Sequence, residues 1–162
     1  MRGTPLLLQL WFIYYAPYYL VPEGIKINLN RFVATIIAFS LNYAAYFAEI
    51  YRGGIESISQ GQYEAAAVLG FTRTQSFFRI ILPQVTKRIL PAVSNEVITL
   101  VKDTALAMSL GISELFRVAK NEATRVFSMT PIFIAGLFYL VMNWFVTKFF
   151  DKFEKKLSYY KG

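Results

Sequence analysis

Long uncharged stretches alternate with polar ones along this 162-residue chain. Three stretches of about 17 to 22 residues contain no charged side chain, and a fourth has a similar length but carries three charges. A helix of about 20 residues crosses the hydrocarbon layer of a bilayer. The pattern predicts an all-α integral membrane protein, a single transmembrane domain over residues 1–162, with about four spans at 4–21, 32–51, 92–111 and 129–150.

Basic residues are distributed unequally between the two sides that these spans define. Arg2, a polar segment at 52–91 and the C-terminal end lie on one side, which holds eleven basic residues against five on the other. Basic residues are enriched on the cytoplasmic side of membrane proteins. The bias therefore predicts a cytoplasmic loop at 52–91 and a cytoplasmic tail at 151–162.

Composition narrows the chemistry. The chain has no Cys and no His, and no phosphate-binding loop of the G-x-x-x-x-G-K-[ST] type. We therefore predict no enzyme activity, no catalytic residue, no metal site and no cofactor bound by this chain. The net charge is +7, and cytoplasmic loops account for it in so apolar a sequence, with 56% hydrophobic residues. Membrane lipid is the predicted environment, and nucleic acid is not a predicted partner.

The cytoplasmic segment has the pattern of two short helices joined by a turn. Capping-box patterns occur at 59–62 (S-x-x-Q) and 72–75 (T-x-x-Q), each ahead of a predicted helix. Gly70 lies between the helices, where a left-handed residue ends the first one. The second helix is predicted to stop near Pro83, because the residue before a proline avoids helical geometry.

Three consecutive alanines follow Glu64 in the first of these helices. They give the helix a face of little side-chain bulk, which another surface can approach closely. The face packs either on the chain's own spans or on another protein, and the spacing leaves both open.

The loop also carries a longer motif. The pattern is E-A-A, three residues, Gly, nine residues and I-x-L-P, and here it comprises Glu64, Ala65, Ala66, Gly70, Ile80, Leu82 and Pro83. This resembles the EAA loop of ABC-transporter permeases. The strings RGTPLLLQL, AEIYRGGIESISQGQ, KDTALA and FEKKL, at 2–10, 48–62, 102–107 and 153–157, resemble the polar amino-acid (histidine/glutamine/arginine) permease family. The resemblance covers essentially the whole chain.

The resemblance implies a type I ABC importer permease-like helical bundle in the cell (inner, cytoplasmic) membrane. Such a subunit moves polar amino acids by alternating access, and residues 59–83 act as a coupling helix in a cleft of the ATPase. The seven motif residues would make the coupling contacts. ATP and magnesium belong to the partner ATPase dimer. The other implied partners are an extracytoplasmic amino-acid-binding protein and a second permease subunit, identical or different. The tail is expected to meet anionic headgroups or the ATPase.

One departure from the family concerns the N-terminus. Members usually have five spans, one of them ahead of the RGTP string, and here Met1 stands almost directly before that string. The family's first span is therefore expected to be missing. The alternatives are a truncated, non-functional permease remnant and a small membrane scaffold or channel that works without an ATPase.

Charges within the third predicted span suggest a substrate path. Lys102 and Asp103 would each cost roughly 2.5–3.5 kcal/mol facing lipid, so they face protein, water or each other. Two interpretations are open. The two side chains form a static ion pair or reach to one membrane interface, or they line a path that offers a positive and a negative charge to an amino acid. Because the family's cavity lies near the corresponding KDT segment, the predicted path comprises Glu49, Asn95, Thr99, Lys102, Asp103 and Thr104.

Two further assignments concern the span ends and the aromatic residues. Glu49 lies three residues before Arg52, so an ion pair at the cytoplasmic edge competes with a gating role for Glu49. Tyr139 and Trp144 are predicted to face lipid or the interface rather than a ligand.

Overall fold

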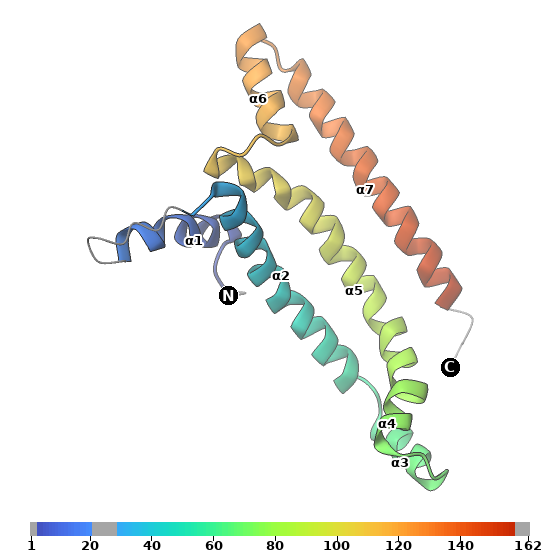
Figure 1. Cartoon of the computed structure of the whole chain (residues 1–162). Coiled ribbons are helices and arrows are strands. Elements are labelled where there is room, and N and C mark those ends of the chain that lie inside the picture. Colours follow the sequence, from blue (N-terminus) through green and yellow to red (C-terminus); the bar gives the residue numbers. More distant parts are fainter. Residues whose placement is uncertain (1–2, 21–28, 158–162) are drawn as a thin grey trace. The chain divides into compact units, whose positions relative to one another are not determined.

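Every regular element in the described part of the chain is a helix (Figure 1). The computed structural model describes residues 3–20 and 29–157, so residue 21 of the first predicted span and residues 158–162 of the predicted tail lie outside it. The elements are α1 (Leu6–Leu20), α2 (Arg31–Glu56), α3 (Gln60–Val68), α4 (Arg73–Ser76), the π-helix η1 (Phe77–Ile81), α5 (Leu82–Asp103), the 3-10 helix η2 (Thr104–Leu110), α6 (Leu115–Val126) and α7 (Thr130–Leu157). The predicted all-α class is confirmed.

Among the described residues, α2 and α7 are long and apolar enough to cross a bilayer by themselves. They have 26 and 28 residues, which correspond to about 39 and 42 Å of helix. Large apolar side chains of α7 point outward, including Phe133, Leu137 and Leu140, while Ala135 is buried. A long helix with so apolar an exposed surface is suited to lipid.

The chain divides into two compact units. One comprises Met1–Ala45 with Ile98–Trp144, and the other comprises Tyr46–Val97 with Phe145–Gly162. In the described part of the first unit, α1 and α6 both pack against η2. Leu10 of α1 is fully buried, and small residues of α2, Ala34 and Ala38, are fully buried as well.

The second unit is centred on a small apolar cluster where the loop meets α5. Ile58, Ile81 and Val85 are buried, and Phe77, Ile80 and Ile89 pack against them. Gly54 of α2 lies at the same contact. A Cβ added to Gly54 would overlap the Ile89 side chain and lie 3.1 Å from Cγ1 of Val85. The absence of a side chain at Gly54 is what lets α2 and α5 approach closely.

Replacing Gly54 with Ala should therefore destabilise the second unit. Overpacking of a tight contact costs about 1–3 kcal/mol, because neighbouring side chains must leave their preferred rotamers. The adjacent Gly53 is a matched control, since its added Cβ would meet nothing within 4 Å. Thermal unfolding in detergent should show a lower midpoint for Gly54→Ala than for Gly53→Ala, and equal midpoints would contradict the packing argument.

The predicted helix end near Pro83 is wrong. α5 begins at Leu82 and continues through both Pro83 and Pro91 to Asp103. The π-helix η1 ends at Ile81, two residues before Pro83, and explains why the helix can continue through this proline. A proline cannot donate to the carbonyl four residues earlier and its ring crowds that carbonyl, but a π turn is wider and uses a different bonding pattern.

Candidate coupling loop and charged helix

α3 ends in a left-handed glycine turn, as the sequence predicts. Gly70 has φ +77°. The amide of Phe71 donates to the carbonyl of Ala66 at 3.1 Å, and the amide of Gly70 donates to the carbonyl of Ala67 at 3.0 Å. These two bonds form a Schellman motif, which turns the chain sharply out of α3. The direction in which α4 leaves α3 thus depends on the left-handed conformation of Gly70.

One predicted capping box is confirmed and the other is wrong. At α4, the amide of Gln75 donates to Oγ1 of Thr72 at 3.3 Å, and the amide of Thr72 donates to Oε1 of Gln75 at 3.0 Å. At α3, the Ser59 side chain makes no capping bond. The side chain of Gln62, which the box requires, instead accepts a hydrogen bond from Nε2 of Gln84 at 3.3 Å. That bond connects α3 to α5.

The outer surface of α3 is exposed and carries apolar side chains at its end. Glu64, Ala65 and Ala67 are exposed and Ala66 is buried. Beyond them, Val68 is 88% exposed and Leu69 is 73% exposed. These two residues, with the exposed alanines, are called the α3 tip below. Of the other predicted coupling residues, Ile80 is partly buried, and Leu82 and Pro83 are exposed at the start of α5.

Residues outside the motif hold the α3 tip in place. η1, which contacts α3, is fixed by the buried cluster of Ile58, Ile81 and Val85, and the Arg88 guanidinium donates to the carbonyl of Ser57. Sequence reasoning missed Ile81 and Arg88, although the Gly53-Gly54 pair indicates that two helices approach each other closely here.

At the end of α5, Asp103 has a partner that no local pattern indicates. Its Oδ2 accepts a hydrogen bond from the hydroxyl of Tyr43 at 2.8 Å. Tyr43 lies on α2 and is buried. In the described residues no ion pair joins Lys102 to Asp103, so the static Lys–Asp pair is not what the structure forms.

Lys102 and Thr104 flank Asp103 where α5 changes into η2. The Lys102 side chain is exposed and lines a hollow of about 240 Å³ together with Ala105, Phe116 and Tyr139. Oγ1 of Thr104 donates to the carbonyl of Val101 at 2.7 Å. The first unit therefore brings Lys102, Asp103 and Thr104 together with Tyr43.

The remaining path candidates are divided between the units. Thr99 belongs to the first unit and is partly buried, whereas Asn95 and Glu49 belong to the second. Glu49 forms the predicted ion pair, with its Oε2 2.6 Å from Nη2 of Arg52. The pair is exposed, so it contributes at most about 1 kcal/mol to stability.

Tyr139, predicted to face lipid or the interface, makes a polar contact within the first unit. Its hydroxyl donates to Oε2 of Glu114 at 3.1 Å, and its ring lines the Lys102 hollow. Glu114 in turn caps α6, accepting from the amides of Phe116 at 2.7 Å and Arg117 at 2.5 Å. The hydrogen bond between Tyr139 and Glu114 therefore connects α7 to the start of α6. Trp144 is half exposed on α7.

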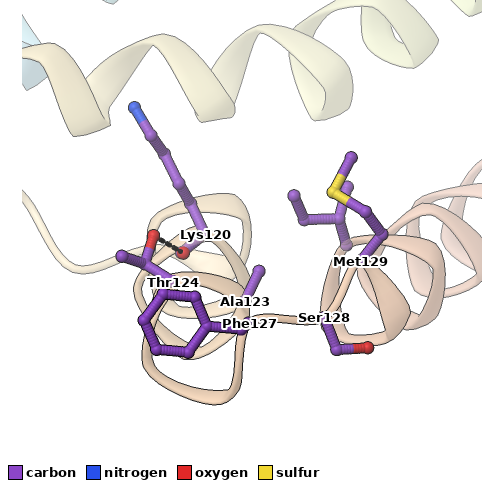
Figure 2. A pocket seen from close by; sticks show the side chains of 7 residues that line it. Lys120, Ala123, Thr124, Phe127, Ser128 and Met129 are labelled. Carbon is purple, nitrogen blue, oxygen red and sulfur yellow. Dashed lines mark hydrogen bonds between the residues drawn. The ribbon is translucent and has the colours of Figure 1, made fainter.

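Figure 2 shows a second hollow in the first unit, where α6 turns into α7. It has a volume of about 340 Å³, and Lys120, Phe127 and Met129 are among the residues that line it. Phe127 is left-handed, with φ +50°, and 96% exposed. The amide of Ser128 donates to the carbonyl of Ala123 at 3.1 Å, so a phenylalanine occupies the position that glycine usually takes in such a turn.

The helical fold, the exposed loop between α2 and α5, and the charged end of α5 fit a subunit of a membrane transporter. A model of the family described as "Binding-protein-dependent transport system inner membrane component" matches residues 1–159. The chain belongs to this family.

Relatives agree with this assignment. The chain is 38% identical over 158 residues to the arginine transport system permease protein ArtQ of Bacillus subtilis, covering 97% of this chain and 70% of that protein. It is 38% identical to a putative glutamine transport system permease protein of Rickettsia felis, covering 96% and 70%. The octopine permease OccM of Rhizobium radiobacter is also 38% identical, covering 94% and 64%.

A solved chain has the same fold. It comes from the structure described as "Crystal structure of an amino acid ABC transporter with histidines", with a TM-score of 0.82 and 36% identity, covering 96% of this chain and 71% of that one. The type I importer permease fold is thereby confirmed. The chain is a permease subunit of an amino-acid ABC transporter.

Proposed function

We propose that this chain forms the membrane path of an ATP-driven importer of polar amino acids and is moved by an ATPase dimer bound to residues 59–83. An extracytoplasmic binding protein delivers the substrate, and a second permease subunit completes the path. ATP and magnesium act on the ATPase. The C-terminus lies in the cytoplasm, in agreement with the excess of basic residues on that side.

The observation that carries this proposal is the α3 tip. Val68 and Leu69 are the most exposed large apolar side chains of the loop at 52–91, and they lie side by side at the end of α3. Exposed apolar side chains on a rigid projection are typical of a surface that another protein covers. The buried cluster that fixes η1 and the Gly70 turn hold the tip in one orientation, so a force applied at the tip is transmitted to α2 and α5.

The charged end of α5 is the proposed place of substrate contact. Lys102, Asp103 and Thr104 offer a cation, an anion and a hydroxyl, which match the two charges of an amino acid and a polar side chain. Thr99 lies one helical turn before them on α5, and Asn95 a further turn away. Glu49 is proposed to act near the cytoplasmic end through its ion pair with Arg52. Relatives named for arginine, glutamine and cystine suggest polar amino acids as the substrate class.

Uptake by proteoliposomes tests the proposal. The chain is reconstituted with an ATPase and an amino-acid-binding protein of an ABC importer from the same organism, and the uptake of labelled arginine and glutamine is measured. Uptake is expected only with ATP inside the vesicles, and it should disappear with an ATPase variant that binds ATP without hydrolysing it. Capture of the ATPase without uptake of any polar amino acid would contradict the transport role, and failure to capture the ATPase would favour the scaffold or remnant.

A further inference from the structure

Two arginines from different helices converge on the turn that ends η2. Gly111 closes this turn in the left-handed conformation, with φ +80°. A Cβ added to Gly111 would lie 2.9 Å from Nη1 of Arg31 and 3.5 Å from Nη1 of Arg117. The two guanidinium nitrogens are therefore separated by no more than the sum of these distances, 6.4 Å. Arg31 begins α2, and Arg117 lies in the first turn of α6.

Neither guanidinium has a carboxylate partner among residues 3–20 and 29–157. Two other arginines there do have one, since Arg52 pairs with Glu49 and Arg125 with Glu122. Nε of Arg31 donates to the hydroxyl of Tyr14 at 3.4 Å, which is a neutral acceptor. The nearest acid along the chain, Glu114, is already occupied by two amides of α6 and by the Tyr139 hydroxyl. Two like charges at this separation repel, so an anion between them would be stabilised.

The pair can be reached from solvent and continues into a basic surface. Arg31 is exposed and Arg117 is partly exposed. Along α6, the exposed Lys120 extends away from the helix (Figure 2), and the side chain of Arg125 is 75% exposed. The hydrogen bond from Arg125 to Glu122, together with the charge of that carboxylate, raises the pKa of the guanidinium above its usual value. Because Glu122 offsets this charge, Arg125 adds little to the basic surface, unlike Lys120. A surface of this sign is complementary to acidic side chains.

We propose that Arg31 and Arg117 bind a carboxylate side chain of the extracytoplasmic binding protein when that protein docks on α6. This inference rests on the proposed function: with residues 59–83 and the C-terminus in the cytoplasm, α6, which lies between α5 and α7, is on the extracytoplasmic side. A guanidinium donates two parallel hydrogen bonds to a carboxylate, and two guanidiniums around one carboxylate hold it more firmly than either alone. Gly111 contributes by having no side chain, because a Cβ there would displace Arg31.

A binding measurement tests the proposed carboxylate contact. The extracytoplasmic binding protein is added to the purified permease–ATPase complex in lipid nanodiscs. The dissociation constant is measured at low and high ionic strength for wild type, Arg31→Gln and Arg117→Gln. Each variant is expected to raise the constant on the order of tenfold at low ionic strength and to weaken its salt dependence. Arg125→Gln is the matched control, since this exposed arginine of the same helix already has Glu122 as its partner. It should change the constant less than threefold.

Further variants distinguish failure of this inference from failure of the proposed function. Arg31→Lys and Arg117→Lys keep the charge and lose the planar fork, so their constants should fall between those of wild type and the Gln variants, even where a Gln variant assembles poorly. Unchanged binding in both Gln variants would overturn the inference. It would also be overturned if they weakened only the binding of free amino acid, because the carboxylate would then be the substrate's.

A separate experiment shows on which side of the membrane α6 lies: Asn121→Cys is labelled on intact cells with a maleimide that does not cross the membrane. If wild type captures the ATPase but binds no binding protein, the proposed function itself fails.

Discussion

Replacing Gly70 with Val is expected to abolish capture of the ATPase while leaving the chain in the membrane. Gly70 has φ +77°, and a Cβ there would meet nothing within 4 Å, so the cost is backbone strain rather than a clash. The left-handed conformation costs a residue with a side chain about 1–2 kcal/mol, and a β-branched one is the least suited to it. A return to negative φ would break the bond from Phe71 to Ala66 and redirect α4 relative to α3. We expect at least a tenfold loss of ATPase co-purified with the tagged chain from detergent.

Two controls make this prediction specific. Gly70→Asn should keep most of the capture, because asparagine tolerates the left-handed region. Gly61→Ala places a methyl group on the same helix where nothing lies within 4 Å and no positive φ is required, so it should behave as wild type. Wild-type capture by Gly70→Val would show that the turn geometry does not matter for docking. Loss of capture in all three variants would indicate that α3 tolerates no change.

Features set by neighbouring residues could be predicted from the sequence. The Thr72–Gln75 box, the Gly70 turn and the Glu49–Arg52 ion pair each involve residues within five positions of one another. Their side chains meet as soon as the helix forms, whatever the rest of the chain does. The Ser59 box failed although its pattern is as good, because Gln84, 22 residues beyond Gln62, competes for the same side chain.

Features that depend on distant residues could not be predicted. Tyr43 and Asp103 are 60 positions apart, and Tyr139 and Glu114 are 25 apart, so no helical periodicity relates them. The convergence of Arg31 and Arg117 on Gly111 has the same cause. Phe127 shows a different limit, since its side chain disfavours the left-handed turn that it adopts.

Replacing Asp103 with Asn is expected to reduce amino-acid uptake at least tenfold, with a smaller loss of stability than removal of the Tyr43 hydroxyl causes. The amide of Asn keeps an oxygen that can accept from the Tyr43 hydroxyl, so the 2.8 Å hydrogen bond can be retained. Only the negative charge is removed. If Asp103 attracts the ammonium group of a passing amino acid, a neutral residue loses a charge-assisted contact, which is about twice as strong as a neutral one. Uptake rates in proteoliposomes and thermal unfolding of the same preparation measure the two effects separately.

Tyr43→Phe is the reciprocal variant, because it keeps the charge and removes the hydroxyl that donates to Asp103. Loss of that donor to a partly buried carboxylate should cost about 1–3 kcal/mol, so the unfolding midpoint should fall while the saturating uptake rate changes little. Opposite responses of the two variants would separate a path role from a structural one. If Asp103→Asn transports as wild type does and only Tyr43→Phe is affected, the carboxylate serves to fasten α2 to α5 and does not contact the substrate. A fall in stability of the same size in both would lead to the same conclusion, since charge and geometry would then have been lost together.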